Sequence, residues 1–411
     1  MACARTGRGR VGESVSHPRQ GHQLLLTQAI FKLITLYQNM KKYFVMAALA
    51  VSTLTASAQS VVPKWINNVK LSGFGIVQYT YNGQENNESN SFNLRLARLA
   101  LDGRAFDDWY WKAQIQFNGN TSTLGSSPKL VDLFIEWQKY DFLRVKAGQF
   151  KNPFTYENPM HPIDQGFMSY SQVISKFAGF SDRAGAHSSN GRDIGVQLQG
   201  DFLKNASGRN LIHYQVGVFN GQGINVKDVD HQKNIIGGAW VMPVEGMRLG
   251  AFGWIGSYAR KGTSASEGIT NTTLRRLQQR RYAFSAEYKV DDWTFRSEYV
   301  HSTGYAFAKA MVNTNDASAK DITLSSNGDK SQGVYALVIA PIIKKKCHAK
   351  ARYDMYQPSK GAEKQRTQYE IGLDYYFNKN ICLTGEYAYI HDRALADPNY
   401  SMIDVELSYR F

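Results

Sequence analysis

The side chains of this sequence that could do chemistry do not form a catalytic pattern. The nine histidines are scattered, and no Cys/His spacing is typical of a zinc site. No Gly-rich phosphate-binding loop precedes a helix. Cys347 and Cys382 fall on opposite faces of strands that are not neighbours, so no disulfide is expected between them. The sequence therefore predicts no enzyme, no metal and no cofactor.

Charged side chains are the remaining candidates, because they alternate with apolar residues and so share one face of the predicted strands. The inward basic residues are Arg98, Lys112, Arg144, Lys146, Arg281, Arg296, Lys350, Arg352 and Arg410. The inward acidic residues are Asp102, Asp132, Glu136, Glu287, Glu298, Asp354, Glu370, Asp374, Glu386, Asp404 and Glu406. Rings of such charges set the selectivity of a wide pore. Since the two sets are nearly balanced, many of them are expected to pair across strands.

The alternation has a period of two residues from Val69 onward, which predicts strands. Sixteen segments show it, at about 69–81, 92–104, 109–118, 129–138, 142–150, 192–202, 210–220, 233–242, 246–258, 279–289, 292–301, 331–340, 346–356, 367–377, 380–390 and 401–411. Segments of about nine to twelve residues suit strands that cross a bilayer at a tilt. Strands of soluble proteins average only about five to six residues.

The connections between these segments alternate in length. The short ones include VDD and NKN, and the long ones include the stretches 151–191, 259–278 and 302–330. A transmembrane barrel has short periplasmic turns and long outer loops, and lipid does not tolerate an open sheet edge. The predicted fold is all-β: a transmembrane antiparallel β-barrel of about 16 strands over residues 69–411, with both ends on the periplasmic side.

Aromatic residues mark the expected membrane interface and the end of the chain. Five tryptophans near the short-turn ends of their strands predict an interfacial girdle: Trp109, Trp111, Trp137, Trp240 and Trp293. The final stretch, MIDVELSYRF, predicts a last strand that closes against the first. Its aromatic residues Tyr409 and Phe411 resemble the terminal signal that the barrel-assembly machinery recognises. Deleting Phe411 is expected to reduce assembly.

The N-terminal region has the pattern of an export signal. Residues 40–58 combine a basic start, an apolar stretch and a small-residue exit, which predicts a signal peptide cleaved after Ala58. Residues 1–39 are interpreted as an upstream non-native extension, and 59–68 as a short N-terminal segment. Residues 1–58 carry seven Lys/Arg and one acidic residue, so without them the formal charge falls from +14 to +8. This moderate excess does not point to nucleic acid.

The stretch LRVKAGQFKNPFTYE, residues 143–157, resembles the strand-to-loop signature of the phosphate-selective porin O and P family. The segments FNLRLARLALDGRAF, GRDIGVQLQG and YQVGVFNGQG are similar to the same family. The resemblance implies a sixteen-stranded outer-membrane barrel, usually a trimer, whose third outer loop folds inward and narrows the pore. In this chain that constriction loop is 151–191, which carries Lys151, Lys176 and Arg183.

These observations predict an outer-membrane porin for passive diffusion of small hydrophilic solutes, with anions preferred and phosphate as one candidate. The predicted anion path consists of Lys151, Lys176 and Arg183 facing Arg98, Arg144 and Lys146. Reversing the charges of Lys176 and Arg183 is expected to shift selectivity towards cations. The expected partners are outer-membrane lipid, small solutes, two further copies of the chain and the barrel-assembly machinery.

Three alternatives stay open from the sequence. A structural or adhesive barrel with a closed lumen would use its loops to bind a partner. An outer-membrane phospholipase would need Ser and His on the outer face, where the sequence offers almost only aliphatic and aromatic residues. A soluble β-sandwich would be recovered in the soluble periplasm.

Overall fold

The computed structural model describes residues 63, 65–118, 128–185, 189–309 and 320–411. Residues Trp65–Phe411 form one compact unit. The predicted upstream extension, 1–39, and the predicted signal peptide, 40–58, lie outside the described residues. Within the described ranges, no helix is both long enough and apolar enough to cross a membrane.

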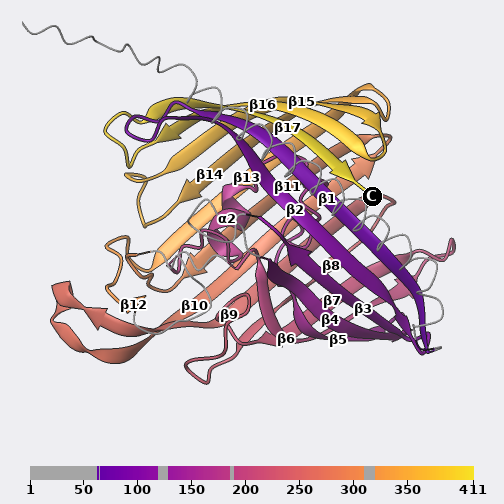
Figure 1. Ribbon diagram of the computed structural model, residues 1–411, viewed down its shortest axis with the longest axis horizontal. Helices are drawn as coiled ribbons and strands as arrows, with labels where there is room; N and C mark the ends of the chain where they lie inside the picture. Colours follow the sequence, from indigo (N-terminus) through magenta and orange to yellow (C-terminus); the bar gives the residue numbers. More distant parts are fainter. Residues whose placement is uncertain (1–62, 64, 119–127, 186–188, 310–319) are drawn as a thin grey trace, which may run out of the picture. The chain divides into compact units, whose positions relative to one another are not determined.

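The described chain is almost entirely an antiparallel sheet (Figure 1). The strands of its wall are β1 (Ile66–Asn82), β2 (Ser89–Ala105), β3 (Trp109–Gln116), β4 (Lys129–Tyr140), β5 (Leu143–Lys151), β6 (Arg192–Lys204), β7 (Asn210–Phe219), β8 (Asn234–Val241), β9 (Met247–Ser264), β10 (Ile269–Val290), β11 (Trp293–Thr303), β13 (Lys330–Ile343), β14 (Cys347–Gln357), β15 (Arg366–Asn378), β16 (Ile381–Asp392) and β17 (Asn399–Arg410). The two-residue strand β12 (Lys320–Asp321) is not part of this wall, because β11 pairs directly with β13.

The sheet closes on itself, since β17 pairs with β16 on one side and with β1 on the other. The seam runs from Phe74 opposite Arg410 to Asn82 opposite Met402. The backbone of Phe411 continues it by two hydrogen bonds to Gly73, of 3.0 and 3.1 Å. The predicted sixteen-stranded barrel and its closing C-terminal strand are thus confirmed.

The outer face of the wall is apolar and carries an aromatic band at each end. Exposed aliphatic residues lie between the bands, for example Leu101, Val196, Ile371 and Leu407. The band near the short turns includes Trp109, Tyr140, Phe142, Trp293, Phe377 and Tyr409. The band near the loops includes Tyr282, Tyr353, Tyr369, Tyr387 and Tyr389. Two such bands around an apolar belt are the signature of a barrel in lipid.

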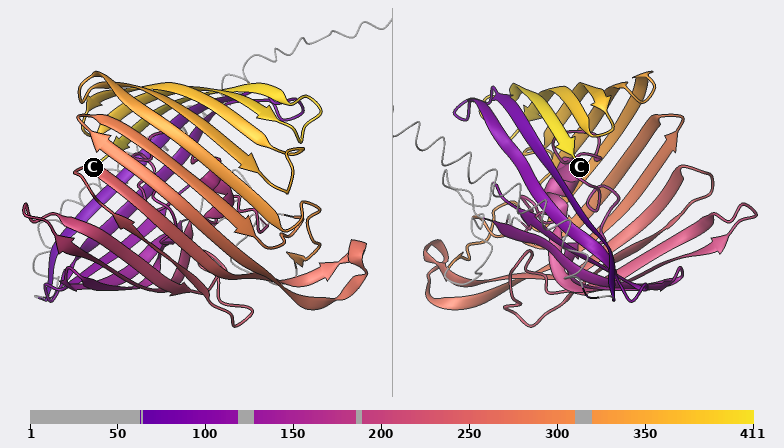
Figure 2. Two further views of the ribbon diagram at one scale, coloured as in Figure 1. Left: turned by 180° about the vertical axis from the view of Figure 1, so that it is seen from behind. Right: turned by 45° about the vertical axis from the view of Figure 1, so that its right-hand side comes forward.

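The stretch 259–278, predicted as a loop, is largely paired. Strands β9 and β10 continue their ladder as far as Ile269 opposite Ser264, and a short 3-10 helix, η1 (Ala265–Glu267), joins them. Figures 1 and 2 show this hairpin projecting beyond the neighbouring strands. The correction has a local cause: TNTTLRR is rich in β-branched residues, which favour extended backbone.

The described residues of the stretch 152–191, which are 152–185 and 189–191 and are called the inner loop below, fold inside the barrel. Their helix α2 (Gln172–Phe177) contacts β11, β13 and β14 and lies within the ring of strands in Figure 1. The side chain of Ser171 caps this helix by accepting from the amide of Ile174 (3.2 Å). The inward folding of the third outer loop is therefore as predicted.

Candidate pore constriction

A single wall carboxylate, Glu298 of β11, holds the start of the inner loop. Its oxygens accept hydrogen bonds from the amides of Tyr156 (2.7 Å) and Glu157 (2.9 Å). The hydroxyl groups of Tyr335 (2.8 Å) and Ser285 also donate to it. The side chain is fully buried. A buried carboxylate with four donors is stable only while those donors stay in place, so this site fixes the loop against the wall.

Two further carboxylates hold the middle of the inner loop. Glu386 of β16 accepts from the amide of Met168 (3.0 Å), and Asp354 of β14 accepts from the amide of Gln172 (2.7 Å). Amide groups of an irregular segment need partners when they are buried. The wall supplies those partners through acidic side chains.

Wall cations make the complementary contacts with carbonyl oxygens of the inner loop. The pairs are Arg296 with Gln165 (2.9 Å), Lys350 with Gly166 (2.8 Å), Arg352 with Ser169 (3.0 Å) and Arg281 with Phe177 (2.5 Å). None of the four cations is more than 6% exposed. Residues that the sequence predicts to line an open pore thus lie between wall and loop.

One side of the inner loop is apolar and packs on an apolar part of the inner wall. Phe154 meets Trp254 edge to face at 5.6 Å between ring centres, and Phe177 meets Tyr356 at 5.7 Å. Edge-to-face aromatic pairs add to the gain from burying apolar area. The loop therefore covers this side of the lumen.

Trp240 belongs to this inner packing and not to the interfacial girdle. Its indole ring stacks on His213 at 3.9 Å and meets Tyr156 of the inner loop edge to face at 5.6 Å. The prediction is corrected here: on β8 the outward positions are those of Ile235 and Val241, which are exposed. The other four tryptophans fit the outer face, and Trp109 lies opposite Trp137 in the β3–β4 ladder.

A basic cluster lies on the wall formed by β2, β5 and β6. It consists of Arg95 and Arg98 of β2, Lys151 at the end of β5 and Arg192 at the start of β6. The Lys151 ammonium group donates to the carbonyl oxygens of Asn158 and Met160, both at 2.7 Å. The Arg98 guanidinium donates to Gln116 Oε1 (2.8 Å) and lies over the ring of Phe74.

Tyr170 of the inner loop shows that these cations converge. Burial raises the pKa of Tyr170, and the positive charges of Arg98, Arg192 and Arg95 oppose that rise. The Lys151 ammonium group is 3.4 Å from its hydroxyl oxygen. The charges of three arginines thus act on a phenol group that Lys151 also contacts.

The carboxylates near the basic cluster do not neutralise every cation. Asp132 forms a two-pronged ion pair with Arg192 (2.6 and 3.0 Å), and Glu406 pairs with Arg95 (2.6 Å). The third carboxylate, Glu157, binds Ser171. Among the described residues, no carboxylate is bonded to Arg98 or to Lys151.

Arg95 and Arg192 were missed at the sequence level. The β1–β2 ladder shifts register where Ile76 and Val77 lie opposite Leu96 and Leu94, so Arg95 is left over in a β-bulge. A bulge re-aims a side chain, and Arg95 points into the lumen although strict alternation assigns it elsewhere. Arg192 is the first residue of β6 and follows directly on the long loop, and it was not among the inward cations predicted from the sequence.

The other predicted basic residues are scattered. Arg144 pairs with Asp201, and Lys146 lies 3.6 Å from Glu136. Lys112 on β3 is half-buried. The structure does not bring these three residues into the basic cluster.

The two remaining loop cations support the loop itself. Arg183 donates to the carbonyl oxygen of Gly304 (2.6 Å), and Lys176 donates to Ser181 Oγ (3.3 Å). Burial lowers the pKa of both residues. Their hydrogen-bond partners differ from those of Lys151, with which the sequence had grouped them.

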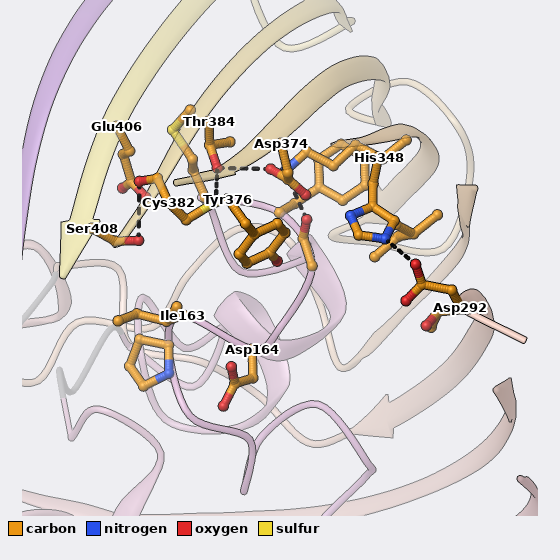
Figure 3. A pocket seen from close by; sticks show the side chains of 17 residues that line it. Ile163, Asp164, Asp292, His348, Asp374, Tyr376, Cys382, Thr384, Glu406 and Ser408 are labelled. Carbon is orange, nitrogen blue, oxygen red and sulfur yellow. Dashed lines mark hydrogen bonds and ion pairs between the residues drawn. The ribbon is translucent and has the colours of Figure 1, made fainter. Parts of the chain in front are cut away.

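A cavity of about 220 Å³ opens between the inner loop and the short-turn ends of β11 and β13–β17 (Figure 3). Most of its labelled side chains are polar, and some of them pair with one another: Thr384 with Asp374 (2.7 Å) and His348 with Asp292 (2.9 Å). Cys347 and Cys382 are unbridged, as predicted. No group of three metal-binding side chains occurs among the described residues.

Comparison with known proteins agrees with this geometry. The family described as phosphate-selective porin O and P matches residues 72–231, which confirms the resemblance over that part of the chain. No curated protein matches the chain by sequence.

Among the solved structures that match, three illustrate the shared fold, and the alignment with each of them covers 84% of this chain. They are OmpT of Vibrio cholerae in a trimer form (13% identity, 99% of that chain, TM-score 0.54), the outer-membrane channel DcaP of Acinetobacter baumannii (14%, 97%, 0.56) and an anion-selective porin from Comamonas acidovorans (15%, 99%, 0.56). The fold is that of a porin, and the family match indicates a channel and not an enzyme.

Proposed function

We propose that this protein is an outer-membrane porin through which small hydrophilic solutes diffuse, with anions preferred. The basic cluster carries the proposal, because it gathers the guanidinium groups of Arg95, Arg98 and Arg192 beside the loop that narrows the lumen, and no carboxylate among the described residues is bonded to Arg98. Charged groups on the wall of a narrow aqueous passage raise the local concentration of the opposite ion.

The comparisons support the same class of solute. One neighbour is named an anion-selective porin, and the matching family is named for phosphate. Phosphate is therefore the first solute to test, and a homotrimer is the first assembly, since another neighbour is described in a trimer form.

The test is the reversal potential of purified protein in a planar bilayer under a KCl gradient. We expect anion selectivity, and we expect the double variant Arg95→Gln with Arg98→Gln to move the chloride-to-potassium permeability ratio towards or below unity. Lys379→Gln, in the exposed turn between β15 and β16, is the matched control and should leave the ratio unchanged. A native cation preference would overturn the proposal.

A closed structural barrel is the second candidate. It is favoured by the number of strands that the inner loop touches: β11, β14 and β16 through hydrogen bonds, and β1 through the ring contact of His161 with Phe74. Complete absence of conductance by correctly folded protein would establish this candidate in place of the porin.

A further inference from the structure

On the outer face of β10, two exposed aromatic residues are followed directly by an exposed arginine. Phe284 and Tyr282 are exposed on this face, at 58% and 46%. The next outward residue is Arg280, which is also exposed. Tyr282 belongs to the aromatic band near the loops, which marks the boundary of the apolar belt. Two residues of strand advance about 7 Å, so Arg280 lies at headgroup level.

Arg280 is in cross-strand register with a second cation, Lys330, which lies two strands away. The three residues Arg280, Thr303 and Lys330 are called a row below. Arg280 lies opposite Thr303 of β11, which in turn lies opposite Lys330 of β13. Neighbouring strands are about 4.8 Å apart, so the two backbones are separated by about 10 Å. Both long side chains can therefore reach one group placed over Thr303.

The next set of outward residues across the three strands, on the side of the apolar belt, offers a flat aromatic surface for such a group. Tyr282 lies opposite His301, and their rings stack at 5.2 Å. Gln332 completes this set opposite His301 and accepts a hydrogen bond from Tyr299 (2.9 Å).

Neither cation has a carboxylate partner among the described residues. Other arginines of β10 do: Arg276 pairs with Asp230 (2.9 Å), and the inward Arg281 pairs with Asp182 (2.7 Å). Lys330 and Arg280 are both exposed. Two cations without carboxylate partners, one on each side of Thr303, are complementary to a phosphate group.

We propose that the row Arg280–Thr303–Lys330 binds the phosphate of an anionic glycolipid of the outer leaflet. Arg280 and Lys330 supply charge-assisted hydrogen bonds to the phosphate group, and the rings of Tyr282 and His301 lie against the part of the lipid where the acyl chains meet the sugar. The inference rests on the proposed outer-membrane location and goes beyond it, because it assigns a lipid site outside the channel.

The experiment compares binding of bisphosphorylated lipid A and of the same lipid without its phosphates, by native mass spectrometry in detergent. The native protein should bind the phosphorylated lipid at least about tenfold more tightly. Arg280→Gln with Lys330→Gln should remove about that factor, while the control Lys379→Gln should not. Channel conductance of the same variants should be unchanged, so failure of the lipid site is distinguishable from failure of the porin proposal.

Three results would overturn the lipid site. Equal binding of the two lipids would show that phosphate is not recognised. Full competition by millimolar inorganic phosphate would assign the row to a free anion. Loss of oligomer in the double variant, with unchanged lipid binding, would assign it to contact between copies of the chain.

Discussion

At the scale of single residues, the lumen is organised by side chains that bind the backbone of the inner loop. Glu298 is the clearest of these, since one carboxylate takes four donors, two from the inner loop and one each from β10 and β13. Hydrogen bonds to a charged acceptor contribute about 1.5–3 kcal/mol each. The position of the constriction therefore depends on a residue that solute does not touch.

Replacing Glu298 by Ala should release the start of the inner loop. We expect a loss of about 3 kcal/mol in the free energy of unfolding and noisier, larger single-channel currents. Glu298→Gln keeps one acceptor oxygen, so its free energy of unfolding should fall by less. Glu245→Ala, in the exposed turn before β9, is the control. Currents of native size and noise in Glu298→Ala would show that packing alone holds the loop.

His161 gives the inner loop a dependence on pH. Its ring packs on Phe74 at 4.4 Å, and its Nδ1 accepts from the amide of Ile163 (3.3 Å), which requires the neutral form. Burial lowers the pKa of His161 to about 4, while Asp164 opposes that shift. Because the unfolded value is about 6.5, the folded state disfavours the proton, and stability falls as the pH drops from about 6.5 to about 4.

Current noise of the native channel should therefore increase over that pH range. His161→Gln should flatten the dependence, whereas His391→Gln, in a hydrogen bond to Asn399 at the loop end of β16, should not. The measurement is single-channel recording at stepped pH. A pH response that persists in His161→Gln would assign it to another group.

At the scale of elements, the bulge in β2 decides which charges enter the lumen. One extra residue in the ladder opposite Ile76 and Val77 turns Arg95 inward, where it reaches Glu406 on β17 at 2.6 Å. The strand keeps Leu94 and Leu99 facing outward on either side of the shift. The bulge thus adds a pore cation without placing a charge in lipid.

Deleting Arg95 should restore regular pairing between β1 and β2. The barrel should still assemble, and the chloride-to-potassium permeability ratio should fall. Arg95→Gln keeps the bulge and removes only the charge, so the two variants separate geometry from electrostatics. If the deletion variant fails to assemble while Arg95→Gln assembles, the bulge is needed for closure of the barrel.

At the scale of the whole molecule, the seam between β1 and β17 depends on glycine. A Cβ atom on Gly75 would lie 2.5 Å from the ring of Tyr409, and one on Gly73 would lie 2.6 Å from the ring of Phe411. The aromatic rings of the last strand thus lie directly over the bare backbone of the first. The terminal residues predicted as an assembly signal also cover the seam.

Gly75→Ala should weaken closure of the barrel, because crowding of this kind costs about 1–3 kcal/mol. The matched control is Gly253→Ala on β9, where a Cβ atom would meet nothing within 4 Å. The measurement is the temperature at which folded barrel is lost on unheated gels. Equal temperatures for the two variants would show that the Tyr409 ring moves aside without cost.

The amino-acid pattern alone predicted the strands and the closed sheet, because a strand has two faces and lipid on one side and water on the other are visible as alternation. The inward third loop was an expectation from the family resemblance and did not follow from the alternation. The same rule correctly assigned the inward side chains Glu298, Arg352 and Asp404, all of which are buried. The paired β9–β10 hairpin was missed because polar pairing outside the membrane leaves no alternation.

Only the tertiary structure decided what the inward charges do. Arg281 and Arg352 bind the inner loop, Arg98 does not, and nothing in their own strands distinguishes them. The partners are set by where a folded loop places its amides and carbonyl oxygens, which are more than 100 residues from Glu298, Glu386 and Asp354 in the chain. Arg95 points inward because of a register shift in the pairing of β1 with β2. Trp240 points inward because the outward positions of β8 are those of Ile235 and Val241.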